Sequence, residues 1–348
     1  MQQDLKLSSN TAKLHQMFGP KLYGDKYSFI SEMCQNAVDS HRAAKQTKPV
    51  LVGLKRKINT KGNVPWTFYV KDEGLSFKDP DDFIAKVCTL LESGKSSNKT
   101  NDENCEMGEH GIGSISASAF QPVWQYDVVT PTGEYFFCIF RWIEGRGLTY
   151  DMSPVEKTTD TKSVTFSLEF EGVHFPYLVD AMKRKLCYFK DIQFEFDAHA
   201  QSNDRSLLVL NSFFKIDQAK DFQVSTLSKF HGMHVCLDQY SYDIKWDLLG
   251  MPAIPLNIGL RFGLGDGLKA DITRENLVHH DDYKNIVMKK IRDVATWFIE
   301  KYNTGIPAEF ENIELIHREM NKVKVVSIGS LNFNIDYLAN LSHTPVKP

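Results

Sequence analysis

Three polar residues with helical spacing, Glu32, Asn36 and Asp39, are the first candidates for chemistry. Asn36 and Asp39 follow Glu32 by four and seven positions, which places all three side chains on one face of a helix. A glutamate can activate a water molecule, and the carbonyl oxygen of an asparagine can bind Mg²⁺. The triplet therefore suits metal and phosphate chemistry, although a solvated polar face has the same spacing.

A second candidate pair, Asp72 and Gly74, lies in the stretch VKDEGLSF, directly after a predicted strand. An aspartate at the end of a strand can accept a hydrogen bond from the exocyclic amine of adenine. A glycine two residues later lets the backbone approach the ring closely. An ordinary Asp/Gly turn has the same sequence, so the pair alone does not decide between the two.

Two further features suit phosphate. The stretch MGEHGIGSISASAF contains Gly108, Gly111 and Gly113 and follows a polar segment over residues 93–106. Glycine turns that open a helix present backbone N–H groups to phosphate, and the helix dipole favours the anion. Arg274, in KADITRENL, suits a γ-phosphate because a planar guanidinium can bind two oxygens at once. A surface ion pair is the alternative interpretation of this arginine.

The elements that must position these residues follow from apolar periodicity and turn signals. An apolar stripe predicts a helix over residues 26–45, opposite the acidic face. Strands are expected on either side of a turn, at residues 50–57 and 66–71, and the glycines precede a helix of small residues. Further strands are expected at residues 123–129, 134–142 and 163–170. A second α/β unit is expected over residues 189–303, with a long amphipathic helix at residues 281–302.

Taken in order, Glu-x3-Asn-x2-Asp, Asp-x-Gly and Gly-x2-Gly-x-Gly resemble the motif set of the GHKL ATPases, which share the Bergerat fold. The stretch GIGSISASAF is similar to the glycine motif of the ninety-kilodalton heat-shock chaperones. Residues 18–44 resemble the N-box region of phage rIIA-like lysis-inhibitor proteins, and residues 255–277 resemble those proteins and the chaperone middle domain. The resemblance covers residues from about 14 to 300 and is strongest at the motifs.

This resemblance implies a role for each residue of the first two motifs. Glu32 would be the general base that orients the attacking water. Asn36 would bind Mg²⁺, and Asp39 beside it would support the nucleotide pocket. Asp72 would recognise adenine, and Gly74 would give room for the base.

The remaining motif residues would act on the phosphates of ATP. Gly108, Gly111 and Gly113 would wrap the phosphates, and residues 93–107 would form the ATP lid. Arg274 would reach the γ-phosphate from the second domain, which would couple hydrolysis to domain docking. Such proteins usually dimerise through the ATPase domain when ATP is bound, so an ATP-dependent homodimer is expected.

The expected fold class is therefore α+β. A Bergerat-type two-layer α/β sandwich is expected over residues 1–175, followed by a transducer-like or middle-domain-like α/β domain over residues 176–304. Residues 305–348 are expected to be a tail or a small extension. The expected function is that of a Mg²⁺-dependent ATPase of the rIIA-like kind, which switches conformation on binding nucleotide.

The sequence also departs from the family pattern. The second motif of the family ends in a further glycine, and Ser76 stands at that position. The threonine that these proteins place near adenine is not assigned, and Thr165 is a candidate. Lys245 and Lys269 are both candidates for the transducer lysine of some families, and the sequence does not choose between them.

Composition restricts the setting. The 348 residues carry a formal net charge of −3, which gives no general attraction to nucleic acid or anionic membranes. The six cysteines form no C-x-x-C pair, which argues against a zinc ribbon or a thioredoxin-like site, and reduced thiols are expected. The N-terminus lacks a secretory signal, and no apolar stretch is long enough to span a bilayer. We expect a cytoplasmic protein, in the host cytoplasm if a phage encodes it.

Other nucleotide and metal sites fit less well. A P-loop at Gly94-Lys95-Ser96 fails because Thr89 stands where the Walker pattern needs a glycine. The run His279-His280-Asp281-Asp282 resembles a solvated helix start more than a metal site, because adjacent residues on a helix point apart.

Two other functions remain open. The chain could be the ATPase and transducer part of a DNA-acting machine, similar to a type II topoisomerase or a MutL-type repair protein. It could also bind a protein client, as a chaperone does. Salt-dependent DNA binding discriminates between these classes, because phosphate contacts give a steep salt dependence.

Overall fold

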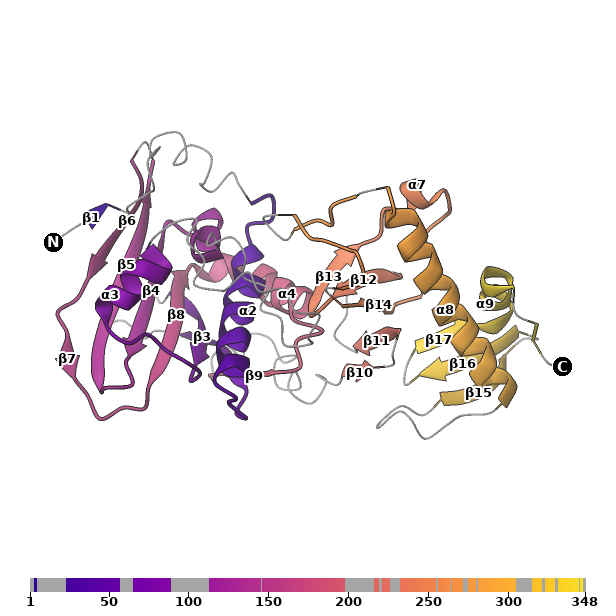
Figure 1. Ribbon diagram of the computed structural model, residues 1–348, viewed down its shortest axis with the longest axis horizontal. Coiled ribbons are helices and arrows are strands. Elements are labelled where there is room, and N and C mark those ends of the chain that lie inside the picture. Colours follow the sequence, from indigo (N-terminus) through magenta and orange to yellow (C-terminus); the bar gives the residue numbers. More distant parts are fainter. Residues whose placement is uncertain are drawn as a thin grey trace. The chain divides into compact units, whose positions relative to one another are not determined.

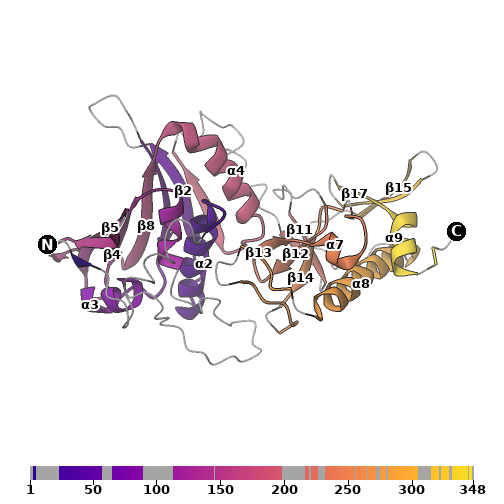
Figure 2. The same cartoon turned by 90° about the horizontal axis from the view of Figure 1, so that it is seen from above.

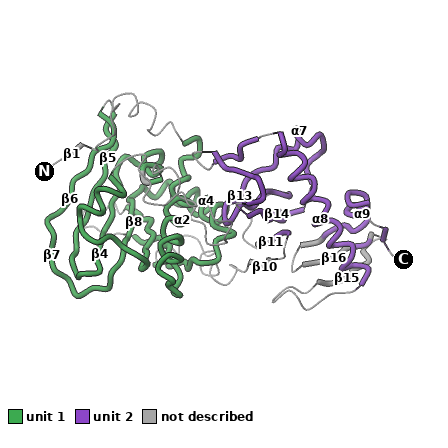
Figure 3. Tube along the Cα trace, viewed as in Figure 1, with its two compact units in different colours: residues 1–213 green, residues 214–348 purple. Residues whose placement is uncertain are grey.

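The computed structural model describes residues 3–4, 23–56, 65–88, 113–144, 146–197, 216–218, 221–225, 232–254, 256–263, 265–271, 275–279, 281–304, 315–320, 323–328, 331–343 and 345–346. The chain divides into two compact units, Met1–Phe213 and Phe214–Pro348 (Figure 3). Among the described residues, the first unit has one sheet and the second unit has two, and each unit has its own helices (Figure 1).

The described strands of the first unit form one sheet in the order β1-β6-β5-β4-β8-β3-β2-β9, with β7 paired to β5. The β2–β9 pair is parallel, and the other pairs described in this sheet are antiparallel. The strands are β1 (Gln3–Asp4), β2 (Val50–Arg56), β3 (Trp66–Asp72), β4 (Val123–Val129), β5 (Glu134–Ile143), β6 (Gly147–Met152), β7 (Glu156–Lys157), β8 (Ser163–Phe170) and β9 (Ile192–Phe196).

Helices cover one face of this sheet (Figure 2). They are α2 (Ser28–Ala43), α3 (Pro80–Phe83), α4 (Phe175–Lys185), the π-helical turn η1 (Ile84–Cys88), and the short 3₁₀ helices η2 (Gly113–Ala119) and η3 (Gly172–His174). Phe29 of α2 packs edge-on against Phe68 of β3, with ring centroids 5.4 Å apart. Because side chains of a strand alternate between faces, Asp72, four residues after Phe68, faces the same helical layer.

The second unit holds a five-stranded sheet in the order β10-β11-β14-β12-β13 and a three-stranded sheet β15-β16-β17. Phe298 of α8 packs on Phe222 of the five-stranded sheet and on Phe333 of the three-stranded sheet. The elements are β10 (Ile216–Gln218), β11 (Phe222–Ser225), β12 (His234–Leu237), β13 (Tyr240–Asp243), α7 (Trp246–Leu249), β14 (Gly259–Phe262), α8 (Tyr283–Thr304), β15 (Leu315–Met320), β16 (Val323–Ile328), β17 (Leu331–Asn334) and α9 (Ile335–Ser342).

These elements confirm the expected α+β class, and α2 falls within the helix predicted over residues 26–45. The first compact unit extends past the expected boundary at residue 175, because α4 packs on α2 and β9 pairs with β2. The expected tail over residues 305–348 contains β15, β16, β17 and α9, which belong to the second unit.

The structure also bears on the expectations about cysteines and membrane-spanning segments. The five cysteines among the described residues are free and buried: Cys34, Cys88, Cys138, Cys187 and Cys236. None of the described helices has the length and apolar character that crossing a bilayer requires.

Candidate functional site

Helix α2 carries the first motif in two different environments. The side chains of Glu32 and Asp39 are buried, with 7% and 4% of their surface exposed, whereas Asn36 between them is exposed. The hydrogen bond from the N–H of Tyr27 to Oδ1 of Asp25, 2.9 Å long, lies directly before the helix. The helix thus presents an amide to solvent beside a largely buried carboxylate.

Gly113, the first residue of η2, lies against this part of α2. A Cβ atom added at Gly113 would lie 2.8 Å from Oε2 of Glu32 and 3.5 Å from Nδ2 of Asn36. Real Cβ atoms essentially never approach another heavy atom to less than 3.0 Å, so a side chain here would displace Glu32. The structure therefore brings a glycine of the third motif to the glutamate and the asparagine of the first.

Asp39 faces a different set of partners on the same helix. Nε2 of the fully buried Gln35 donates to Oδ1 of Asp39 over 2.7 Å. Nη1 of Arg42 lies 4.0 Å from the same oxygen, and Nη2 of Arg42 donates to Oδ2 of Asp191 over 3.3 Å. Asp39 is thus held within the protein by an amide and a guanidinium.

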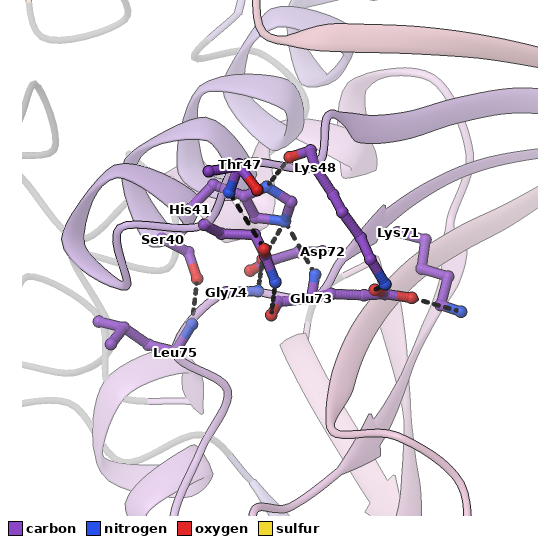
Figure 4. Close-up of polar contacts among 10 residues, drawn as sticks. Ser40, His41, Thr47, Lys48, Lys71, Asp72, Glu73, Gly74 and Leu75 are labelled. Atoms are coloured by element: carbon purple, nitrogen blue, oxygen red, sulfur yellow. Dashed lines mark hydrogen bonds and ion pairs between the residues drawn. The ribbon is translucent and has the colours of Figure 1, made fainter.

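Asp72 ends β3 and faces the last turn of α2 (Figure 4). Its Oδ1 accepts the N–H of Gly74 over 2.6 Å and lies 3.0 Å from Nε2 of His41. Only 11% of the Asp72 side chain is exposed. The Asp72 carboxylate, which the sequence suggests as the group that binds adenine, is therefore held in place by a backbone N–H and a histidine.

Gly74 allows the chain after β3 to touch the backbone of α2. A Cβ atom at Gly74 would lie 2.5 Å from Oγ of Ser40 and 2.6 Å from the carbonyl carbon and oxygen of Ser40. Beside this contact, the N–H of Leu75 donates to Oγ of Ser40 over 2.9 Å (Figure 4). This packing accounts for a glycine at the position without requiring a ligand.

Ser76 has a left-handed backbone conformation, although it is not a glycine. Its φ is +58°, in the left-handed region that glycine occupies most easily. The hydroxyl of Ser76 donates to the carbonyl of Val129 over 2.8 Å. The serine thus keeps the turn and replaces the freedom of glycine with a hydrogen bond to β4.

The strand register identifies the neighbour of Asp72 in β8. Val164 lies directly opposite Asp72, and Thr165 lies opposite Lys71. Residues directly opposite in an antiparallel pair share a face, so Val164 lies beside Asp72 in the helical layer. Thr165, the candidate for the adenine-side threonine, is on the other face of the sheet.

Several predicted site residues lie outside the described residues. These are Gly108, Gly111, Arg274 and the whole expected lid over residues 93–107. Among the residues that the structure describes, no group of three or more His, Cys, Asp or Glu side chains is arranged to hold a metal ion.

His41 is a further residue of this site, and the sequence motifs do not include it. This residue contacts Asp72 from the last turn of α2, and only 4% of its surface is exposed. The sequence does place His41 within the helix that carries the first motif, two positions after Asp39. A contact between this helix and the end of β3 cannot be read from spacing alone.

The comparisons with known proteins gave structural similarity without sequence similarity. No family model matches the chain, and no curated protein matches it. The ATPase region of topoisomerase II from Saccharomyces cerevisiae is similar with a TM-score of 0.43 and 12% identity, over 78% of this chain and 85% of that chain. The same region bound to ICRF-187 (dexrazoxane) gives a TM-score of 0.41 and 13% identity, over 79% and 85%.

Proposed function

We propose that the first unit binds ATP in a Bergerat-type site and hydrolyses it with Mg²⁺. The observation that carries this proposal is the approach of Gly113 to Glu32 and Asn36. Residues from two separate motifs meet there, and they supply a carboxylate, an amide and a backbone without a side chain. These are the groups that a magnesium nucleotide needs around its phosphates.

The surroundings of α2 suit the assigned roles. Asn36 is exposed, so its carbonyl oxygen is accessible to Mg²⁺, which usually keeps several waters. Glu32 is mostly buried beside Gly113 and would activate the attacking water. Asp39, held by Gln35 and Arg42, would support the pocket from within.

Asp72 would read the base of the nucleotide. Its position at the end of β3, facing α2, supports this role because the carboxylate is fixed and its acceptor capacity is not exhausted by protein donors. Gly108, Gly111 and Gly113 would wrap the phosphates, and residues 93–107 would close over them.

The sequence resemblance supports three further parts of the proposal, which are the role of Arg274, ATP-dependent dimerisation and the location in the cell. Arg274 of the second unit would reach the γ-phosphate, so hydrolysis would be coupled to the second unit. ATP binding would promote a homodimer and a change of conformation, as the similarity to rIIA-like proteins suggests. The site of action would be the cytoplasm.

The substitution Glu32→Ala tests the proposal. We expect it to abolish phosphate release from ATP and to keep the nucleotide-dependent thermal shift, because it removes the base and leaves Asp72 and the glycines. Glu169→Ala is a matched control, because Glu169 is an exposed glutamate on the other face of β8. Turnover by Glu32→Ala at the wild-type rate would refute the assignment of the base, and no thermal shift with wild type would refute ATP binding.

A further inference from the structure

His41 is held by three polar contacts that involve both ring nitrogens (Figure 4). Nδ1 lies 2.9 Å from the carbonyl oxygen of Lys48. Nε2 lies 2.9 Å from the backbone nitrogen of Glu73 and 3.0 Å from Oδ1 of Asp72. The ring is buried, so these partners decide where its protons lie.

The three partners cannot all be satisfied by one protonation state of His41. The Lys48 carbonyl only accepts, so Nδ1 carries a proton in either state. In the neutral ring, the single lone pair of Nε2 accepts the N–H of Glu73, so Nε2 has no proton to donate to the Asp72 carboxylate. In the charged ring, Nε2 donates to Asp72 and gives up the bond from Glu73. Protonation therefore exchanges one partner for the other.

The protonation state of His41 acts on one of the two oxygens of the Asp72 carboxylate. Among the described residues, its polar contacts go to Oδ1, from Gly74 and His41. Oδ2 is the oxygen left to accept a hydrogen bond from an amino group of a ligand. A hydrogen bond from the charged ring of His41 fixes the carboxylate plane and hence the direction of Oδ2, whereas the neutral ring, 3.0 Å away, donates no such bond.

We infer that His41 is a positioning residue for base recognition: its charged form holds Asp72 in the orientation that binds the amino group of adenine, and its neutral form releases Asp72. The inference rests on the proposed function, because it takes Asp72 as the residue that reads the base. Affinity for adenine nucleotides is then highest at low pH and falls as His41 loses its proton.

The charges around His41 support this direction. Burial lowers the pKa of His41, but the bond and charge of Asp72, the Lys48 carbonyl and the charge of Glu73 together raise it above the ordinary 6.5. The last turn of a helix also favours a cation. The nearby cations face other partners: Lys48 and Lys71 pair with Glu73, and Arg42 pairs with Asp39 and Asp191.

The raised pKa of His41 determines whether the folding stability rises or falls with pH. The contribution of the charged His41–Asp72 pair to folding is fully present below the unfolded-state pKa of histidine. It is lost as the pH rises through the higher pKa of the folded state. Ligand binding adds to the same linkage, because a ligand that needs the held carboxylate raises the pKa of His41 further.

The test measures the dissociation constant of ADP with Mg²⁺ by calorimetry from pH 5.5 to 8.5, for wild type and His41→Gln. Glutamine keeps a donor but does not titrate in this range. The ratio of the two constants at each pH cancels the ionisation of the phosphates. We expect the advantage of wild type over His41→Gln to fall roughly five- to tenfold between low and high pH, which lies within the usual range of coupling between sites.

A second measurement needs no folded variant. The pKa of His41 in wild type, followed by NMR, should rise when saturating adenosine is added, because adenosine brings no phosphate charge. A pH-independent ratio of the dissociation constants, or an unchanged pKa, would overturn the role of His41 while ADP binding stands. An absence of ADP binding by wild type at every pH would instead overturn the proposed function, and this inference with it.

Discussion

Gly113→Ala tests whether the contact between Gly113 and Glu32 matters for turnover. The added Cβ would lie 2.8 Å from Oε2 of Glu32, so the carboxylate has to move by 0.2 Å to reach the 3.0 Å limit and by 0.6 Å to reach ordinary contact at 3.4 Å. Oε2 is the far end of a flexible side chain, so the carboxylate can make this shift at little cost in stability, but it then leaves its wild-type position. A misplacement approaching 1 Å at a catalytic group can cost about 100-fold in rate.

We therefore expect Gly113→Ala to lower kcat for ATP hydrolysis by roughly 10- to 100-fold. The stability should change by less than about 1 kcal/mol, because two small effects oppose each other. Forcing Glu32 off its rotamer costs about 0.5–1.5 kcal/mol. Replacing a glycine whose φ is not in the left-handed region restricts the unfolded chain and stabilises by about 0.4–1 kcal/mol.

The assay is phosphate release at saturating ATP, together with urea unfolding of the same preparations. Gly172→Ala is a matched control, because its added Cβ would meet Trp66 at ordinary distances of 3.5 and 3.7 Å. The control should keep kcat within about twofold of wild type, since no catalytic group has to move. If Gly113→Ala also kept wild-type turnover, Glu32 would not be a base positioned by this contact.

Two other substitutions test the remaining motifs. Gly74→Ala should lower the free energy of unfolding by about 1–3 kcal/mol in urea denaturation, because the new Cβ overlaps the backbone of Ser40; wild-type stability would show that α2 moves freely. Arg274→Ala should reduce phosphate release more than it weakens ADP binding measured by calorimetry, because ADP lacks the γ-phosphate. Unchanged hydrolysis by Arg274→Ala would show that this arginine does not serve the site.

Local spacing determined which residues could share a surface. The positions of Glu32, Asn36 and Asp39 fix one helical face once α2 forms, because the helical repeat alone sets the angle between side chains. The same holds for β3, where alternation along the strand places Phe68 and Asp72 on one side. The sequence also shows a serine where the resemblance implies a glycine, and in the structure Ser76 has the left-handed backbone conformation that glycine adopts most easily.

Tertiary structure alone decided which of these surfaces meet. The approach of Gly113 to Glu32 joins distant segments and depends on the packing of η2 on α2. The pairing of β3 with β8, which are distant in the sequence, put Val164 rather than Thr165 beside Asp72. The parallel pairing of β9 with β2 likewise carried the first unit past residue 175.

His41 shows the difference most clearly. The sequence supplies a histidine in the last turn of a helix, where it could equally have faced solvent. Its function as a partner of Asp72 exists only because the end of β3 packs against that turn, with Gly74 close to Ser40. Burial then removes competing water, so the protonation state of one ring can control the orientation of one carboxylate.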